Sequence, residues 1–125
     1  MNNTKTLEIT VTQEMSAANV GSGMIDVFST PMMIAMMEKT CALLAAEYLE
    51  VGYTTVGTLV SVEHLAATPV GMKVRIEAKL TYHEGRRFCF EVIAFDEKEQ
   101  IGRGKHERFS VDSEKFQKKA NAKLI

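Results

Sequence analysis

The segment from residue 31 to residue 51 places the strongest constraint on the fold of this chain. Thr30 supplies an N-cap hydroxyl before it, Pro31 suits the first helical position, and Gly52 supplies a C-terminal stop. The predicted helix is about 31 Å long. A helix that is apolar nearly all round is wrapped by other elements rather than laid on a surface. Its apolar side chains are Met32, Met33, Ile34, Met36, Met37, Cys41, Leu43, Leu44 and Leu49.

Alternating segments on both sides of this helix predict strands. Before it, Leu7, Ile9 and Val11 alternate with polar residues, which is the period of a half-buried strand. One strand, a long buried helix and four antiparallel strands predict an α+β domain whose sheet curls around the helix. The polar, lysine-rich end of the chain, residues 114–125, predicts a short surface helix or a frayed tail. The four later strands are expected over residues 56–63, 73–82, 88–95 and 101–111, with turn signals at 84–85 and 96–98.

The size and charge of the chain limit what it can bind. The 125 residues predict a single domain over residues 1–125. A core of that size leaves little volume for an internal cavity, so a small-molecule site is expected to need a wall from a second subunit. With 15 basic and 16 acidic side chains, the net charge of −1 excludes the extended basic face of a general nucleic-acid binder.

No segment predicts a membrane partner, a metal site or a redox cofactor. The apolar stretch 32–49 is interrupted by charged residues, and the first residues lack an apolar run behind a basic start, so a cytoplasmic location is expected. Cys41 and Cys89 lie in apolar segments without the spacing of a metal site. Both are expected to be reduced and buried, and Cys41 to be packing rather than a nucleophile.

A carboxylate and a histidine are the first candidates for chemistry. Glu38 stands among apolar helix residues, where burial disfavours a charge that has no partner. His64 follows Val60 and Val62 on the apolar face of its strand, so it points toward the helix and could be that partner. A buried Glu and His can carry acid–base or nucleophilic chemistry near neutral pH. The structural alternatives are a solvated stripe for Glu38 and a satisfied core position for His64.

Three further residues have two interpretations each. Thr30 has an N-cap role, and it lies about 12 Å from Glu38 along a straight helix, so reaching the same site requires a bend at the cap. His106 and Arg108 share one face of their strand. They could hold an anionic part of a ligand, or be solvated cross-strand charges. The glycine-rich run 102–106 lacks the following helix that a phosphate-binding loop requires.

Four stretches of the sequence are specific when taken together. They read Val-Gly-Ser-Gly at 20–23, Val-Phe-Ser-Thr-Pro-Met-Met at 27–33 leading to Glu38, Val-Gly-Thr at 56–58, and His-Leu-Ala-Ala-Thr-Pro-Val-Gly at 64–71. In this order and spacing, over residues 20–111, the chain resembles the hotdog-fold thioesterases of the fluoroacetyl-CoA thioesterase type.

The resemblance implies a hotdog fold, in which an antiparallel sheet wraps a long helix. It also implies a homodimer whose sheets join edge to edge, with or without pairing of dimers into tetramers, and acyl-CoA sites at the dimer interface. The implied catalytic group is Thr30, Glu38 and His64. The residues implied beside the substrate are Gly57, Arg108, His106 and Phe28.

The expected reaction is hydrolysis of a short or medium acyl-CoA to the free acid and CoA. Glu38 either attacks the carbonyl to give a transient anhydride or activates a water, while His64 moves protons. Thr30 orients one of these groups, and the Gly57 N–H faces the developing oxyanion. Fluoroacetyl specificity is not carried over, because residues 23–25 are Gly, Met and Ile where the resemblance implies an aromatic lid.

Two other function classes compete with this one. A non-catalytic acyl-CoA binding or sensing module would bind CoA thioesters without turnover. A hotdog enoyl-CoA hydratase or dehydratase ranks third, because its acid–base pattern is not found in the sequence.

Overall fold

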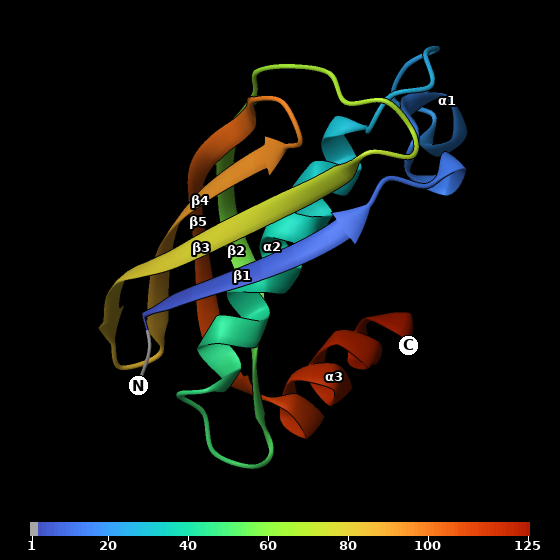
Figure 1. Ribbon diagram of the computed structural model, residues 1–125. Coiled ribbons are helices and arrows are strands. Elements are labelled where there is room, and N and C mark those ends of the chain that lie inside the picture. Colours follow the sequence, from blue (N-terminus) through green and yellow to red (C-terminus); the bar gives the residue numbers. More distant parts are fainter. Residues whose placement is uncertain (1–2) are drawn as a thin grey trace.

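The expected strands form one five-stranded antiparallel sheet that curls around the long helix (Figure 1). The computed structural model describes residues 3–125, so Met1 and Asn2 of the predicted domain lie outside the described residues. The sheet order is β1-β3-β4-β5-β2, which makes β1 and β2 the edge strands. The elements are β1 (Thr4–Thr10), a 3₁₀ turn (Gln13–Met15), α1 (Ala17–Val20), α2 (Thr30–Ala46), β2 (Tyr53–His64), β3 (Lys73–Glu84), β4 (Arg87–Asp96), β5 (Gln100–Asp112), α3 (Ser113–Asn121) and a last 3₁₀ turn (Ala122–Leu124).

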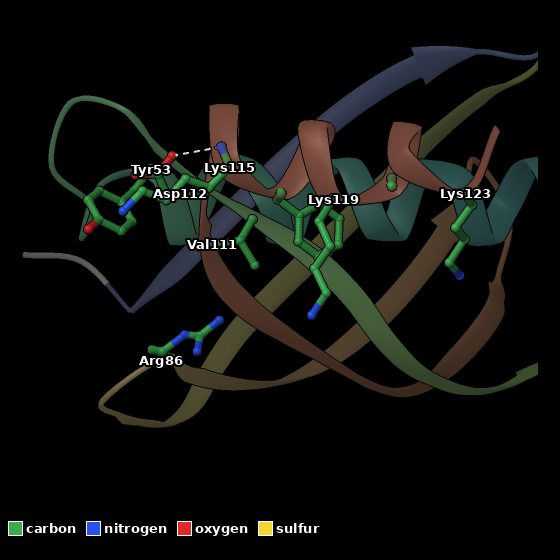
Figure 2. A pocket seen from close by; sticks show the side chains of 9 residues that line it. Tyr53, Arg86, Val111, Asp112, Lys115, Lys119 and Lys123 are labelled. Carbon is green, nitrogen blue, oxygen red and sulfur yellow. Dashed lines mark hydrogen bonds between the residues drawn. The ribbon is translucent and has the colours of Figure 1, made fainter. Parts of the chain in front are cut away.

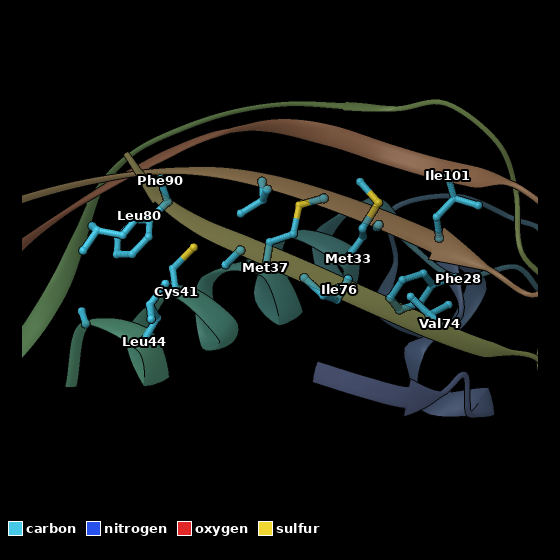
Figure 3. Packing of buried hydrophobic residues seen from close by; sticks show 14 of the residues in the cluster. Phe28, Met33, Met37, Cys41, Leu44, Val74, Ile76, Leu80, Phe90 and Ile101 are labelled. Carbon is cyan, nitrogen blue, oxygen red and sulfur yellow. The ribbon is translucent and has the colours of Figure 1, made fainter. Parts of the chain in front are cut away.

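One face of α2 forms the centre of the core (Figure 3). Met33, Met37, Cys41 and Leu44 recur every three or four residues, and all four are buried against the sheet. The alternating residues of β3 and β4 supply the other wall, including Val74, Ile76, Phe88 and Phe90. The opposite side of α2 is open, since Lys39 is exposed and Leu43 is 41% exposed. The expectation that this helix is wrapped all round is therefore wrong within one chain.

The limits of α2 differ from those expected. The helix begins at Thr30 and ends at Ala46, five residues before the predicted end. The amides of Glu47, Tyr48 and Leu49 donate to carbonyls three residues earlier, so the last turn tightens into a 3₁₀ pattern that ends the α-helix. The N-cap is Ser29, not Thr30: the Ser29 hydroxyl accepts a hydrogen bond from the amide of Met32 at 3.2 Å.

Two connections bring the start of α2 next to the end of β2. The amide of Phe28 donates to the carbonyl of Thr68 at 2.8 Å, and Val27 forms a bridge with Pro69. The segment before α2 also contains the short helix α1, which Gly21 ends with a φ of 90°. Phe28, two residues before the start of α2, is therefore hydrogen-bonded to the connection that follows β2.

The C-terminal segment and the cysteines largely follow expectation. Residues 113–121 form the surface helix α3, capped by the Asp112 side chain, and every residue from 113 to 125 is exposed. Both cysteines are free, but only Cys41 is buried, since Cys89 is half-buried. Within residues 3–125, none of the helices is long and apolar enough to cross a membrane.

The core packing predicts a large difference between two α2 side chains. Met37→Ala leaves a cavity under the sheet, and we expect it to lower the free energy of unfolding by about 2–5 kcal/mol. Leu43→Ala, on the open side of the same helix, is expected to cost about 1 kcal/mol or less. Urea unfolding followed by circular dichroism measures both, and equal losses would contradict the packing described.

Candidate functional site

A threonine and a histidine meet at the N-terminus of α2. The Oγ1 of Thr30 lies 2.7 Å from Nδ1 of His64, the last residue of β2. Because Ser29 provides the helix cap, the Thr30 hydroxyl is available for this hydrogen bond. The two side chains line a cleft of about 350 Å³, together with Phe28 and residues 65–67. The sequence-predicted Thr30 and His64 therefore do meet, beside a space that a small molecule can enter.

The environment of His64 keeps the imidazole neutral. Burial lowers the pKa of His64 below its ordinary value. Its Nε2 is buried and has no hydrogen-bond partner among the described residues. A neutral imidazole with one nitrogen bonded to a hydroxyl and the other unbonded can accept and deliver a proton at neutral pH.

Glu38 belongs to a second cluster, about 12 Å further along α2 at the rise of an α-helix. Its Oε2 lies 3.8 Å from Nη1 of Arg108, which is 8% exposed. Within residues 3–125, no hydrogen bond or ion pair joins Glu38 to His64. The partner that stabilises the Glu38 carboxylate is thus Arg108 rather than the expected histidine.

Arg108 is held in place by its neighbours on β2 and β5. Its Nε donates to Oγ1 of Thr55 at 2.7 Å and its Nη2 donates to the Thr55 carbonyl at 2.8 Å. Burial lowers the pKa of Arg108, and the charge of Glu38 opposes that shift. A buried guanidinium with this many acceptors has one orientation, and it lies within ion-pair distance of the half-exposed Glu38 carboxylate.

The tautomer of His106 follows from its two partners. Its Nδ1 lies 2.8 Å from the Leu59 carbonyl, which can only accept, so Nδ1 carries the proton. Its Nε2 therefore accepts from Nη1 of Arg108 at 3.1 Å. Burial lowers the pKa of His106, in agreement with a neutral ring. His106 and Arg108 share a face as expected, but they are buried, and Arg108 pairs with the protein's own carboxylate.

Gly57 is required by the Glu38 cluster. A Cβ on this residue would lie 3.0 Å from Oε2 of Glu38, 3.2 Å from Cε1 of His106 and 3.4 Å from Nη1 of Arg108. Any larger residue would displace the carboxylate or fill the space beside it. The missing side chain leaves Glu38 accessible from the β2 side, where Gly57 is exposed.

The remaining candidates are buried. The ring of Phe28 is 1% exposed and belongs to the core, although it also borders the Thr30–His64 cleft. Burial raises the pKa of Cys41 to about 12, so its thiol stays protonated and is not a nucleophile at neutral pH. Gly102 lies in β5, where a Cβ would come within 2.6 Å of the Met33 sulfur, so this glycine serves close packing.

Sequence reasoning missed Thr55, which anchors Arg108. The signal was present in the strand period, because Thr55 lies two residues before Gly57 and therefore shares its face. The pairing of Gly57 with Arg108 across β2 and β5 was not available from the sequence, and it is what brings Thr55 within reach of the guanidinium.

Comparisons with known proteins show the family of the chain. The family model described as fluoroacetyl-CoA-specific thioesterase matches residues 11–114. A fluoroacetyl-CoA thioesterase from Streptantibioticus cattleyicolor is 43% identical over 98 residues, which is 78% of this chain and 70% of that protein. A solved fluoroacetyl-CoA thioesterase structure is 34% identical with a TM-score of 0.93, covering 98% of this chain and 96% of its own.

A more distant relative shows the breadth of the fold. A Thermus thermophilus thioesterase superfamily member is 28% identical with a TM-score of 0.88, covering 97% of this chain and 90% of its own. The match to the family model extends over most of the chain, and the structural matches include β1 and the C-terminal region. The chain belongs to the fluoroacetyl-CoA-specific thioesterase family, a group of hotdog-fold thioester hydrolases.

Proposed function

We propose that the protein hydrolyses the thioester of a short or medium acyl-CoA, with Thr30, Glu38 and His64 as the site residues. The observation that carries the proposal is the 2.7 Å contact between the Thr30 hydroxyl and a neutral His64 beside a cleft. Solved relatives support a short acyl group, since one is a complex with acetyl-CoA and another a complex with fluoroacetate and CoA. Selectivity for fluoroacetyl is not part of the proposal, because residues 23–25 carry no aromatic side chain.

The mechanism has two routes that both end with proton delivery from His64. In one, a Glu38 oxygen attacks the carbonyl and the C–S bond breaks, which gives the anhydride and the CoA thiolate. Neutral His64 then takes a proton from a water whose oxygen cleaves the anhydride, and it passes that proton to the thiolate. In the other, Glu38 takes a proton from the water that attacks the carbonyl, the C–S bond breaks, and the proton moves from Glu38 through His64 to the CoA thiolate. In both, Thr30 holds the ring. The Gly57 N–H stabilises the oxyanion. These steps need no metal or redox cofactor.

A homodimer would bring the two clusters together. β2 is an edge strand with one side unpaired, and it exposes Leu59 and Val60. If two copies pair their β2 strands antiparallel about an axis between Val60 and Ser61, Gly57 of one copy lies opposite His64 of the other. The Glu38 cluster of one protomer would then face the Thr30–His64 pair of its partner.

The two free cysteines are compatible with the reducing cytoplasm as the location of the protein.

The catalytic assignment predicts the effect of two substitutions. Glu38→Gln keeps the shape and removes the charge, and His64→Ala removes the proton carrier. Each is expected to lower thiol release from acetyl-CoA by at least about 100-fold, because general acid–base catalysis contributes that much. Lys39→Gln, an exposed neighbour on α2, is the matched control and should retain turnover.

Colorimetric thiol detection gives the rates, and circular dichroism confirms that each variant is folded. Saturable binding of acyl-CoA by a wild-type protein that hydrolyses no better than buffer would overturn the proposal in favour of a binding module.

The pKa of His64 predicts the acid limit of activity. Neutral His64 relays the proton, and burial lowers its pKa, so activity should persist below the ordinary histidine value of about 6.5 and fall only as pH drops through the lowered pKa. The pH profile of kcat/KM measures this limit. Thr30→Val should shift this acid limit, because the variant removes the hydrogen bond to His64. The surroundings of His106 stay intact, so a shift assigns the limit to His64 rather than to His106. A limit at or above pH 6.5 would contradict the assignment.

The proposed dimer predicts that assembly and turnover are lost together. Val60→Asp places two like charges near the axis, which disfavours pairing of the strands. Light scattering should show a wild-type dimer and a folded, inactive monomer for this variant. Val51→Asp, in the exposed turn before β2, is the control and should remain an active dimer. A fully active wild-type monomer would refute the proposal.

A further inference from the structure

A cleft with a strongly basic lining lies between α3 and the paired ends of β2 and β5 (Figure 2). Its volume is about 650 Å³, within the range of small-molecule sites. Four cationic side chains and one carboxylate line it. The carboxylate, Asp112, already caps α3 by accepting from the amide of Lys115. The cations are Arg86, Lys115, Lys119 and Lys123.

The three lysines are arranged in a way that destabilises the free protein. They recur at intervals of four residues, so they share one side of the C-terminal helical segment, as Figure 2 shows. Like charges at this spacing repel one another. Across residues 3–125, no ion pair neutralises any of the three. A bound anion would relieve this repulsion.

Arg86 adds a positioned cation on the other side of the cleft. It lies in the turn between β3 and β4, and its Nε donates to the Ser110 carbonyl at 2.9 Å. This bond holds the guanidinium at the end of β5, opposite the lysines of α3 (Figure 2). A planar guanidinium held in this way suits recognition of phosphate oxygens.

Two aromatic side chains give the cleft an apolar wall. Tyr53 is 50% exposed and Phe116 is 46% exposed, and both line the same space. Exposed rings beside cations suit a ligand that carries a flat base as well as phosphates, because a base can stack on an aromatic face. An inorganic anion alone would leave these rings uncovered.

The cleft also lies at a suitable distance from the Glu38 cluster. Tyr53 precedes Gly57 by four residues on β2, or about 13 Å at the rise of a strand. Tyr53 and Gly57 are both exposed and lie on an edge strand, so a flexible ligand can extend along this edge from one position to the other. A CoA thioester has this form, with a reactive end joined by a long flexible arm to a phosphorylated nucleotide.

We propose that the α3 cleft binds the 3′-phosphorylated ADP end of the acyl-CoA substrate, with Arg86 and Lys119 on its phosphates and Tyr53 and Phe116 against its base. This inference rests on the proposed function for the identity of the substrate. The cleft sets affinity for the CoA carrier, and the Glu38 and His64 clusters act on the acyl group.

The test compares two thioesters that differ only in the nucleotide. Wild-type protein, Arg86→Gln and the double variant Lys119→Gln/Lys123→Gln are assayed on acetyl-CoA and on acetyl-pantetheine, which lacks the nucleotide. Each variant should lower the ratio of the two kcat/KM values by about tenfold or more, mainly through KM for acetyl-CoA, because charged hydrogen bonds are lost. The effect should weaken at high salt. Lys79→Gln/Lys98→Gln, on exposed lysines of β3 and of the β4–β5 turn, should leave the ratio as in wild type.

A binding measurement separates this proposal from the proposed function. Adenosine 3′,5′-bisphosphate is titrated calorimetrically into wild-type protein and the double variant. Binding by wild type that weakens about tenfold or more in the variant supports the cleft, even if neither thioester is hydrolysed. Equal affinity in the two proteins, absence of binding, or an unchanged ratio of kcat/KM values overturns it.

Discussion

The packing of one face of α2 against the curled sheet is the interaction on which the rest of the structure depends. Met33, Met37, Cys41 and Leu44 anchor the helix along its length. Protein interiors are packed as densely as organic crystals, so a helix held at four successive turns has little freedom to slide or rotate. The two site residues on this helix, Thr30 and Glu38, therefore keep a fixed separation and direction. The sheet supplies their partners, His64 and Arg108.

The buried charge of Arg108 is the second constraint on the site. A guanidinium removed from water is costly unless acceptors surround it. Thr55, His106 and Glu38 provide them from β2, β5 and α2. The network links three elements and places a cation beside the Glu38 carboxylate, which lies next to Gly57. The same residues thus stabilise the fold and position a reactive group.

Much of the fold could be predicted from the sequence, and the reasons are local. Alternation in β3 is nearly unbroken, because one face of the strand packs on α2, so the period alone located this strand. The end of α2 could not be located, since apolar residues continue past Ala46 and a switch in the hydrogen-bond pattern decides where the helix stops.

Thr30 was assigned the capping role because Ser29 and Thr30 are equally suited to it by residue type. Only the three-dimensional structure shows that Ser29 takes it. The partner of Glu38 was missed because Arg108 is seventy residues away, and only the pairing of β2 with β5 brings it near.

The adjacent hydroxyls of Ser29 and Thr30 have different roles. At this point of the chain the fold and the reaction therefore depend on different side chains. Ser29 satisfies an amide that every helix N-terminus leaves without a partner, whereas the Thr30 hydroxyl hydrogen-bonds to the histidine of the site. A lineage can therefore alter the residue at position 30, and with it the chemistry at the cleft, while the helix remains capped. Substitutions at position 30 would then change the activity while the stability of the fold changes little.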